Sequence, residues 1–226
     1  MSAVADQDAQ PRNDARLRVT EIFHSLQGEA RDVGWPTVFV RLTGCPLRCT
    51  WCDTEYAFHG GDWRGIDDIV AQVAKYKTQR VCVTGGEPLA QKRCLGLLTR
   101  LCDAGYAVSL ETSGALDVSE VDPRVVRVVD LKAPGSGEET RNLWSNCDVL
   151  TARDQVKFVL ADRGDYDWAR RVIDERALTQ RCEVLLSPVH GRLEPRTLAD
   201  WILADRLPVR LQIQLHKVLW GGEPGR

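Results

Sequence analysis

Hydrophobic positions follow two periods that alternate along the chain. Short alternating or continuous apolar stretches predict strands at 17–23, 37–42, 80–84, 107–110, 125–131, 156–160, 182–186 and 209–215. Apolar residues at helical spacing between them predict helices around 66–73, 97–102, 166–173 and 198–202. The 125–131 segment is apolar at nearly every position, which is typical of a parallel strand covered on both faces.

Strands that alternate with helices predict an α/β fold built on a parallel sheet. The pattern contains about six strand–helix units, fewer than the eight that close a TIM barrel. We therefore expect an open, partial TIM-like barrel. The length of 226 residues fits one domain, predicted at 16–226, which follows a polar and disordered leader at 1–15.

The segment 44–64 interrupts the alternation. It is rich in cysteine, glycine and aromatic residues and has no helical or strand period. Long loops inside compact domains tend to carry function. We predict that this loop holds the reactive centre.

Composition removes several classes of function. The net charge of −2 gives no electrostatic basis for nucleic-acid binding. No apolar run approaches the ~20 residues of a membrane span, and the polar start has no secretory core, so a cytoplasmic enzyme with no membrane partner is expected. Thiols in that compartment stay reduced, so the eight cysteines predict a metal or cluster site plus packing thiols.

Three of these cysteines, Cys45, Cys49 and Cys52, have the spacing C-x3-C-x2-C. Iron–sulfur clusters are held by thiolates, usually four, so three would leave one iron without a protein ligand. Such an iron can bind a small molecule. A structural zinc site, with His59 as the fourth ligand, is the alternative that the spacing leaves open.

Further motifs accompany the cysteines. Trp51 stands one residue before the last cysteine, and Gly85-Gly86-Glu87-Pro88 follows the next predicted strand. In these features the chain resembles the radical S-adenosylmethionine (SAM) enzymes. The resemblance implies a [4Fe-4S] cluster on the three cysteines and SAM bound at its open iron. The residues it implies for SAM are Trp51, Cys52, Asp53, Gly86, Glu87, Ser113, Asp130, Leu131, Lys132, Ser187, Pro188, Val189 and His190.

A narrower resemblance rests on five segments, 21–29, 40–46, 52–54, 111–114 and 214–217. These are similar to the family of 7-carboxy-7-deazaguanine synthases. The family implies a carbon–nitrogen lyase of queuosine and 7-deazapurine biosynthesis. It converts 6-carboxy-5,6,7,8-tetrahydropterin to 7-carboxy-7-deazaguanine with release of ammonia. The radical comes from SAM at the cluster, so no side chain is assigned as a catalytic residue.

The same resemblance assigns the substrate side. It implies a Mg²⁺ ligand at Thr54 and substrate contacts at Leu26, Gln27, Gly28, Glu29, Arg41, Thr84 and His216. Arg41 offers a bidentate fork to the substrate carboxylate. The implied partners are the pterin, an external flavodoxin-like or ferredoxin-like electron donor, and a second copy of the chain in a homodimer.

The chain departs from the family pattern in two places. Ala30 replaces a glycine, which is costly only if its φ angle is positive. Residues 220–226 extend past the point where some members end. Two other functions stay open at this level: a radical SAM activase that acts on a partner protein, and a zinc-binding interaction module.

Overall fold

The computed structural model describes residues 16–221, 223 and 225, so the predicted leader at 1–15 lies outside it. One nine-stranded sheet has the order β3-β1-β2-β4-β5-β6-β7-β8-β9. Its first part is antiparallel: β1 (Arg16–Leu26) pairs with β2 (Pro36–Leu42) on one side and with β3 (Asp62–Gly65) on the other.

From β2 onward all neighbouring strands are parallel. They are β4 (Arg80–Gly85), β5 (Ala107–Thr112), β6 (Val126–Asp130), β7 (Gln155–Leu160), β8 (Glu183–Pro188) and the short β9 (Arg210–Leu211). The strand order is linear, with β3 and β9 as its two edges. This confirms the open, partial barrel.

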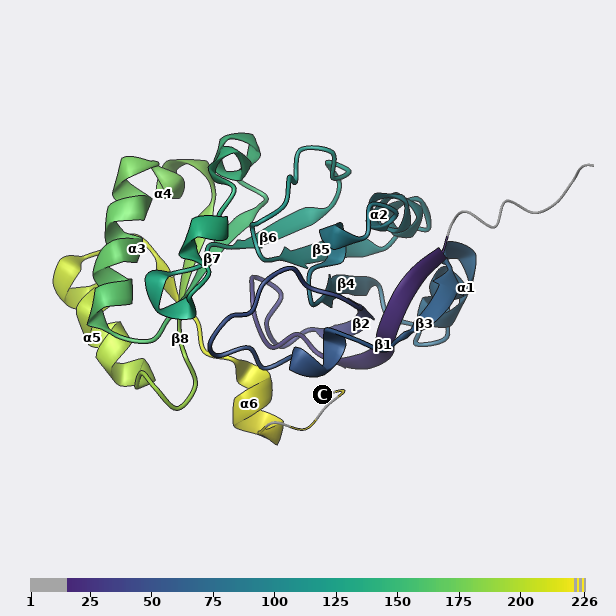
Figure 1. Cartoon of the computed structure of the whole chain (residues 1–226), viewed down its shortest axis with the longest axis horizontal. Helices are drawn as coiled ribbons and strands as arrows, with labels where there is room; N and C mark the ends of the chain where they lie inside the picture. Colours follow the sequence, from purple (N-terminus) through teal and green to yellow (C-terminus); the bar gives the residue numbers. More distant parts are fainter. Residues whose placement is uncertain (1–15, 222, 224, 226) are drawn as a thin grey trace, which may run out of the picture.

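Figure 1 shows the helices at the two ends of the sheet: α1 (Ile66–Ala74) and α2 (Cys94–Asp103) near β1–β5, and α3 (Arg163–Glu175), α4 (Leu178–Arg181) and α5 (Pro195–Asp205) near β7 and β8. α6 (Leu215–Trp220) lies apart from the other helices. No helix in the described part of the chain is long and apolar enough to cross a membrane. The connection from β6 to β7 has no α-helix and carries three short 3-10 helices, at Pro134–Ser136, Glu139–Arg141 and Trp144–Val149.

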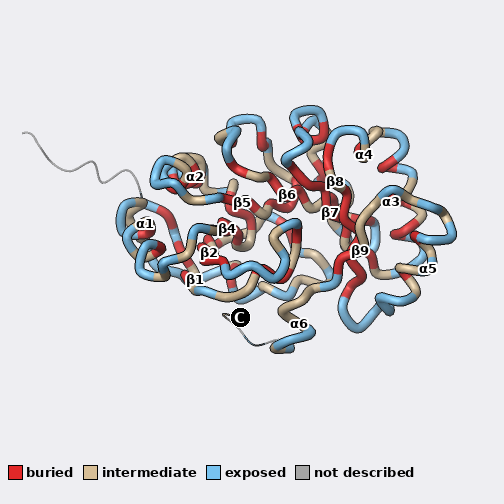
Figure 2. Tube along the Cα trace, turned by 180° about the vertical axis from the view of Figure 1, so that it is seen from behind, coloured by how far each residue is buried: buried red, intermediate tan, exposed pale blue. Residues whose placement is uncertain are grey.

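The core lies between the sheet and the helices. Buried residues follow the strands, and exposed residues follow the outer helices, as Figure 2 shows. Leu97, Leu98 and Leu101 of α2 are fully buried, as are Phe158 of β7 and Tyr166 of α3. The helix face that the apolar spacing predicted is therefore the one that packs on the sheet.

Two predictions about elements were wrong. The end of the 44–64 loop forms β3, which pairs with β1, and a 3-10 turn occupies Glu55–Ala57. The predicted strand 209–215 shrinks to Arg210–Leu211, and Leu215 begins α6. The Leu215 N–H donates to the Gly28 carbonyl at 3.0 Å, which draws the chain away from β8 and toward β1.

Candidate active site

A cavity of about 550 Å³ opens at the C-terminal ends of the parallel strands. Ligand sites of parallel α/β sheets lie at this edge. The predicted site residues line the cavity with four exceptions, which are Glu87, Leu131, Ser187 and Pro188. The cysteine loop, the strand ends and α6 thus enclose one common space.

The cysteine loop is held against the chain that follows β6. Thr50 donates its N–H to the Ser136 carbonyl at 3.0 Å and its hydroxyl to the Gly135 carbonyl at 2.9 Å. The Arg48 N–H donates to Glu138 Oε1. These bonds compensate for the absence of regular secondary structure and fix the backbone that carries Cys49.

Cys45, Cys49 and Cys52 are free thiols of intermediate exposure, and all three line the cavity. Burial raises the pKa of each, that of Cys49 to about 11. The thiols would therefore stay protonated at neutral pH unless a metal centre supplied positive charge, since a coordinating thiol is deprotonated by the metal.

No three His, Cys, Asp or Glu side chains converge on one ion-sized point among residues 16–221, 223 and 225. A cubane cluster needs no such convergence, because each thiolate binds a different iron. The arrangement of the three thiols is compatible with such a cluster. His59, which the zinc alternative requires, is not among the cavity-lining residues.

Gly86 brings the strand end close to the cysteine loop. Its N–H donates to the Leu42 carbonyl at 3.2 Å, and a Cβ on it would stand 2.8 Å from Cys45 Cβ and closer still to the Gly44 carbonyl. Only glycine fits this approach. The GGEP motif thus shapes the backbone beside the cluster loop.

Glu87 lies behind this wall. It is fully buried, and its carboxylate accepts from the Thr112 hydroxyl at 2.9 Å, from the Ser113 N–H at 2.6 Å and from the Ser113 hydroxyl at 2.5 Å. It also accepts from the Leu89 N–H. Glu87 therefore ties the ends of β4 and β5 together.

Asp130 and Lys132 line the cavity at the end of β6. Lys132 Nζ lies 3.1 Å from Asp130 Oδ2, and both side chains are about 15% exposed. Asp130 Oδ1 is buried and has no hydrogen-bond partner in the described part of the chain. A buried acceptor without a partner is costly, so this oxygen fits a donor group of a bound ligand. The carboxylate of Asp130, the ammonium of Lys132 and the short distance between Gly86 and the cysteine loop together fit a bound SAM.

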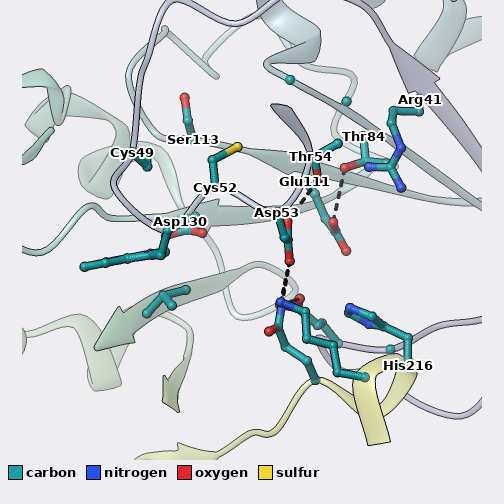
Figure 3. Close-up of a pocket in the computed structure, with 18 of the residues that line it drawn as sticks. Arg41, Cys49, Cys52, Asp53, Thr54, Thr84, Glu111, Ser113, Asp130 and His216 are labelled. Carbon is teal, nitrogen blue, oxygen red and sulfur yellow. Dashed lines mark hydrogen bonds and ion pairs between the residues drawn. The ribbon is translucent and has the colours of Figure 1, made fainter. Parts of the chain in front are cut away.

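Arg41 lies in another part of the cavity, with Thr84 and Glu111, while Cys49, Ser113 and Asp130 lie opposite (Figure 3). Arg41 Nε donates to Glu21 Oε1 at 2.7 Å, and the Tyr56 hydroxyl donates to the same oxygen at 2.8 Å. This arrangement can present the terminal nitrogens of the guanidinium to a ligand carboxylate.

Glu111 is the acceptor for two predicted substrate residues. The Thr84 hydroxyl donates to Glu111 Oε2 at 3.2 Å, and the Gln27 amide donates to Oε1 at 3.3 Å. Burial, reinforced by the negative charge of Glu29, raises the pKa of Glu111 despite the cations nearby.

Glu29 has a lowered pKa, because the ammonium of Lys157 outweighs the effect of burial. Lys157 Nζ lies 2.6 Å from Glu29 Oε2. The amides of Gln214 and Gln212 donate to the same carboxylate at 2.8 and 3.3 Å. Glu29 is thus an ionised acceptor with neighbours from β7, from the residue after β9 and from the N-cap of α6.

α6 forms part of the cavity wall through His216 and Lys217. His216 packs on Gly28, where any Cβ would overlap its ring, and burial lowers the pKa of His216. Lys217 Nζ lies 2.8 Å from Asp53 Oδ2. The tail also contributes, since Gly221, Glu223 and Gly225 line the cavity.

Several residues of the site went unassigned in the sequence. Glu21 and Glu111 stand in segments that carry the resemblance, which was the available signal, but they received no role. Lys157 gave a signal of another kind, a lysine in an otherwise apolar strand. Gln214 and Lys217 likewise stand in a segment that carries the resemblance, 214–217, and received no role. Tyr56 and Gln212 had no signal that sets them apart from other polar residues.

Comparison with known proteins shows which family this chain resembles. Residues 39–175 match the model of the radical SAM superfamily. The 7-carboxy-7-deazaguanine synthase of Chlorobaculum tepidum is 46% identical over 210 residues, which cover 92% of this chain and 96% of the relative. That of Koribacter versatilis is 42% identical over 222 residues, covering 92% and 98%. A crystal structure of QueE from Escherichia coli aligns over 89% of this chain and 95% of that chain with a TM-score of 0.70, and at 24% identity it shows the likeness of fold.

The chain belongs to the radical SAM superfamily and, within it, to the family of 7-carboxy-7-deazaguanine synthases. It therefore uses a [4Fe-4S] cluster and SAM.

Proposed function

We propose that this enzyme converts 6-carboxy-5,6,7,8-tetrahydropterin to 7-carboxy-7-deazaguanine with release of ammonia. The observation that carries the proposal is that one cavity has two parts lined by different groups. The three-cysteine loop and the strand ends at Ser113 and Asp130 occupy one part, and Arg41 with Glu111 occupies another. A cofactor and an anionic heterocycle can therefore lie side by side in this cavity.

Cys45, Cys49 and Cys52 would hold the cluster, which when bound supplies the electron for reductive cleavage of SAM. Gly86, Ser113, Asp130 and Lys132 are the cavity-lining residues proposed to contact SAM. Glu87, Leu131, Ser187 and Pro188 stay predictions, because their side chains are not part of the cavity wall. Trp51, Asp53, Val189 and His190 also line the cavity and are proposed to contact SAM.

The substrate would lie between Arg41 and Glu29. A carboxytetrahydropterin has an anion at one edge and N–H donors at the other. Arg41 suits the anion, and the ionised Glu29 suits the donors. Leu26, Gln27, Gly28, Thr84 and His216 complete the proposed substrate contacts, and each lines the cavity.

A Mg²⁺ ion is proposed at Thr54. The Thr54 hydroxyl lies 2.9 Å from Asp53 Oδ1, so oxygen donors are present at this corner of the cavity. Mg²⁺ prefers six oxygen ligands and keeps several waters, so substrate oxygens and waters would complete the shell. Turnover should then fall when Mg²⁺ is chelated, and return on its addition, while the cluster absorption stays unchanged.

We further propose a cytoplasmic homodimer that receives electrons from a flavodoxin-like or ferredoxin-like protein. These three points rest on the family resemblance. Size-exclusion chromatography with light scattering tests the dimer, and reduction of the cluster by purified donor proteins tests the electron source.

The decisive assay is anaerobic. The reconstituted enzyme is incubated with SAM, dithionite and carboxytetrahydropterin, and product and ammonia are quantified. Equimolar 7-carboxy-7-deazaguanine and ammonia are expected. SAM cleavage without pterin consumption under these conditions would contradict the proposal and favour an activase, whose substrate is a protein backbone.

A further inference from the structure

Lys157 is a buried cation in the middle of the sheet. It lies on β7, its side chain is 11% exposed, and its neighbours Val156 and Phe158 point into the hydrophobic core on the other face. A buried ammonium is costly unless it is paired. Its presence in an otherwise apolar strand therefore calls for partners of opposite charge.

The partners of Lys157 come from two different parts of the cavity. Nζ lies 2.6 Å from Glu29 Oε2, on the substrate side, and 3.4 Å from Asp130 Oδ2, on the side proposed for SAM. Strand register fixes the second contact, since Lys157 is the direct cross-strand neighbour of Asp130 in the β6–β7 pair. The ammonium thus stands between the two carboxylates.

Both carboxylates, those of Glu29 and Asp130, have acceptor sites that no protein group uses in the described part of the chain. A carboxylate has about four acceptor sites. Glu29 accepts from Lys157, Gln212 and Gln214, and Asp130 Oδ1 is buried without a partner in the described part of the chain. Lys157 contacts one oxygen of each group, so it constrains the position of both carboxylates.

We propose that Lys157 is a positioning residue that couples the substrate and SAM subsites, by holding Glu29 and Asp130 at once. This inference rests on the proposed function for its substrate half. It assigns Lys157 no proton transfer. The high pKa that its carboxylate neighbours maintain, against the effect of burial, agrees with a fixed positive charge.

Three variants separate coupling from a role in one subsite. Lys157→Met removes both contacts. Lys132→Met acts on the SAM side alone, because it removes a contact to Asp130 and a proposed SAM contact. Glu29→Gln neutralises the substrate-side carboxylate alone. The measurements are the Kd of SAM for the cluster-loaded enzyme, by anaerobic equilibrium dialysis without pterin, and the KM for pterin. Lys92→Met, at an exposed lysine, is the control and should change neither.

We expect Lys157→Met to raise the SAM Kd and the pterin KM each by roughly 10- to 100-fold, the range for loss of a hydrogen bond to a charged group. Lys132→Met should raise mainly the former, and Glu29→Gln mainly the latter. Adding Lys157→Met to Glu29→Gln should then change the pterin KM little further but still raise the SAM Kd. Lys157→Arg, which keeps the charge, should restore part of both.

A merely structural role predicts another pattern: lower iron content, lower thermal stability and no partial rescue by arginine. That result, or a Lys157→Met variant that moves only one of the two constants, would overturn the coupling. If wild-type enzyme does not consume the pterin, the proposed function has failed. In that case the SAM Kd is the only test of the role of Lys157, and an unchanged SAM Kd in Lys157→Met overturns the inference.

Discussion

Arg41 and Glu21 form an ion pair of 2.7 Å across neighbouring strands β2 and β1, where the two residues are partners in the strand register. Tyr56 donates to the same Glu21 oxygen, so the turn after Thr54 is joined to the pair. The arginine proposed to bind the substrate carboxylate is thus held in place before any ligand arrives.

Glu21→Gln should loosen Arg41 without removing it. A hydrogen bond to a charged group contributes about 1.5–3 kcal/mol, which corresponds to roughly 10- to 100-fold. We expect the KM for pterin to rise within that range, and the SAM Kd and cluster absorption to stay unchanged. Glu120→Gln, at an exposed position, is the control. An unchanged pterin KM would show that Glu21 does not position Arg41.

Gly86→Ala should damage the cluster site. The added methyl would lie 2.8 Å from Cys45 Cβ and would also meet the Gly44 backbone, so Cys45 must move. Iron and sulfide per chain should fall. Gly96→Ala is the matched control, because its nearest neighbour is a flexible Ile66 methyl at 3.5 Å. Equal iron content in the two variants would mean that the loop absorbs the change.

Asp154→Asn should destabilise the fold. Asp154 is 1% exposed and lies 2.6 Å from Arg127, which would be left as an unpaired buried charge at a cost of about 3–5 kcal/mol. Asp67→Asn breaks an exposed pair with Arg100 and should cost less than about 1 kcal/mol. Urea unfolding at pH 7 measures both free energies.

The same pair predicts a pH dependence. Burial would raise the pKa of Asp154, but hydrogen bonds from Arg127 and Thr151 outweigh it and lower the pKa. A carboxyl with a lowered folded-state pKa stabilises the protein above its unfolded pKa of about 3.9, and that contribution is lost as the pH falls through the folded value. The difference between wild type and Asp154→Asn should therefore shrink below about pH 4. A difference independent of pH would contradict this assignment.

The residues that line the cavity were easier to predict from the sequence than the residues and elements that hold them in place. The cysteine spacing and the polar residues at strand ends identify the cavity, because parallel strands bring their C-terminal ends to one edge. The role of Lys157 could not be predicted, since it depends on the β6–β7 register. α6 was missed because 209–215 has an apolar pattern that also suits a strand. In the structure Leu215 instead donates its N–H to the Gly28 carbonyl, a contact between segments far apart in the sequence.

The effect of Ala30, where the family pattern has glycine, could be judged only once its backbone φ angle was known. Its φ angle is +63°, a left-handed value that costs a non-glycine residue about 1–2 kcal/mol. Ala133, equally buried, has a φ of −73°. We expect Ala133→Gly to be less stable than Ala30→Gly, by about 1–2 kcal/mol in the free energy of unfolding relative to wild type. Equal effects would mean that Ala30 is not strained.

The central claim is that one cavity joins SAM chemistry to a pterin carboxylate held by Arg41. The measurement that tests it most directly is product formation against pterin concentration for Arg41→Ala, with SAM cleavage followed in the same samples. Leaving a charged ligand group without its partner costs about 2–5 kcal/mol, so the KM should rise on the order of 30- to 3,000-fold. SAM binding and the cluster absorption should stay near wild type. Normal pterin turnover by Arg41→Ala would contradict the account.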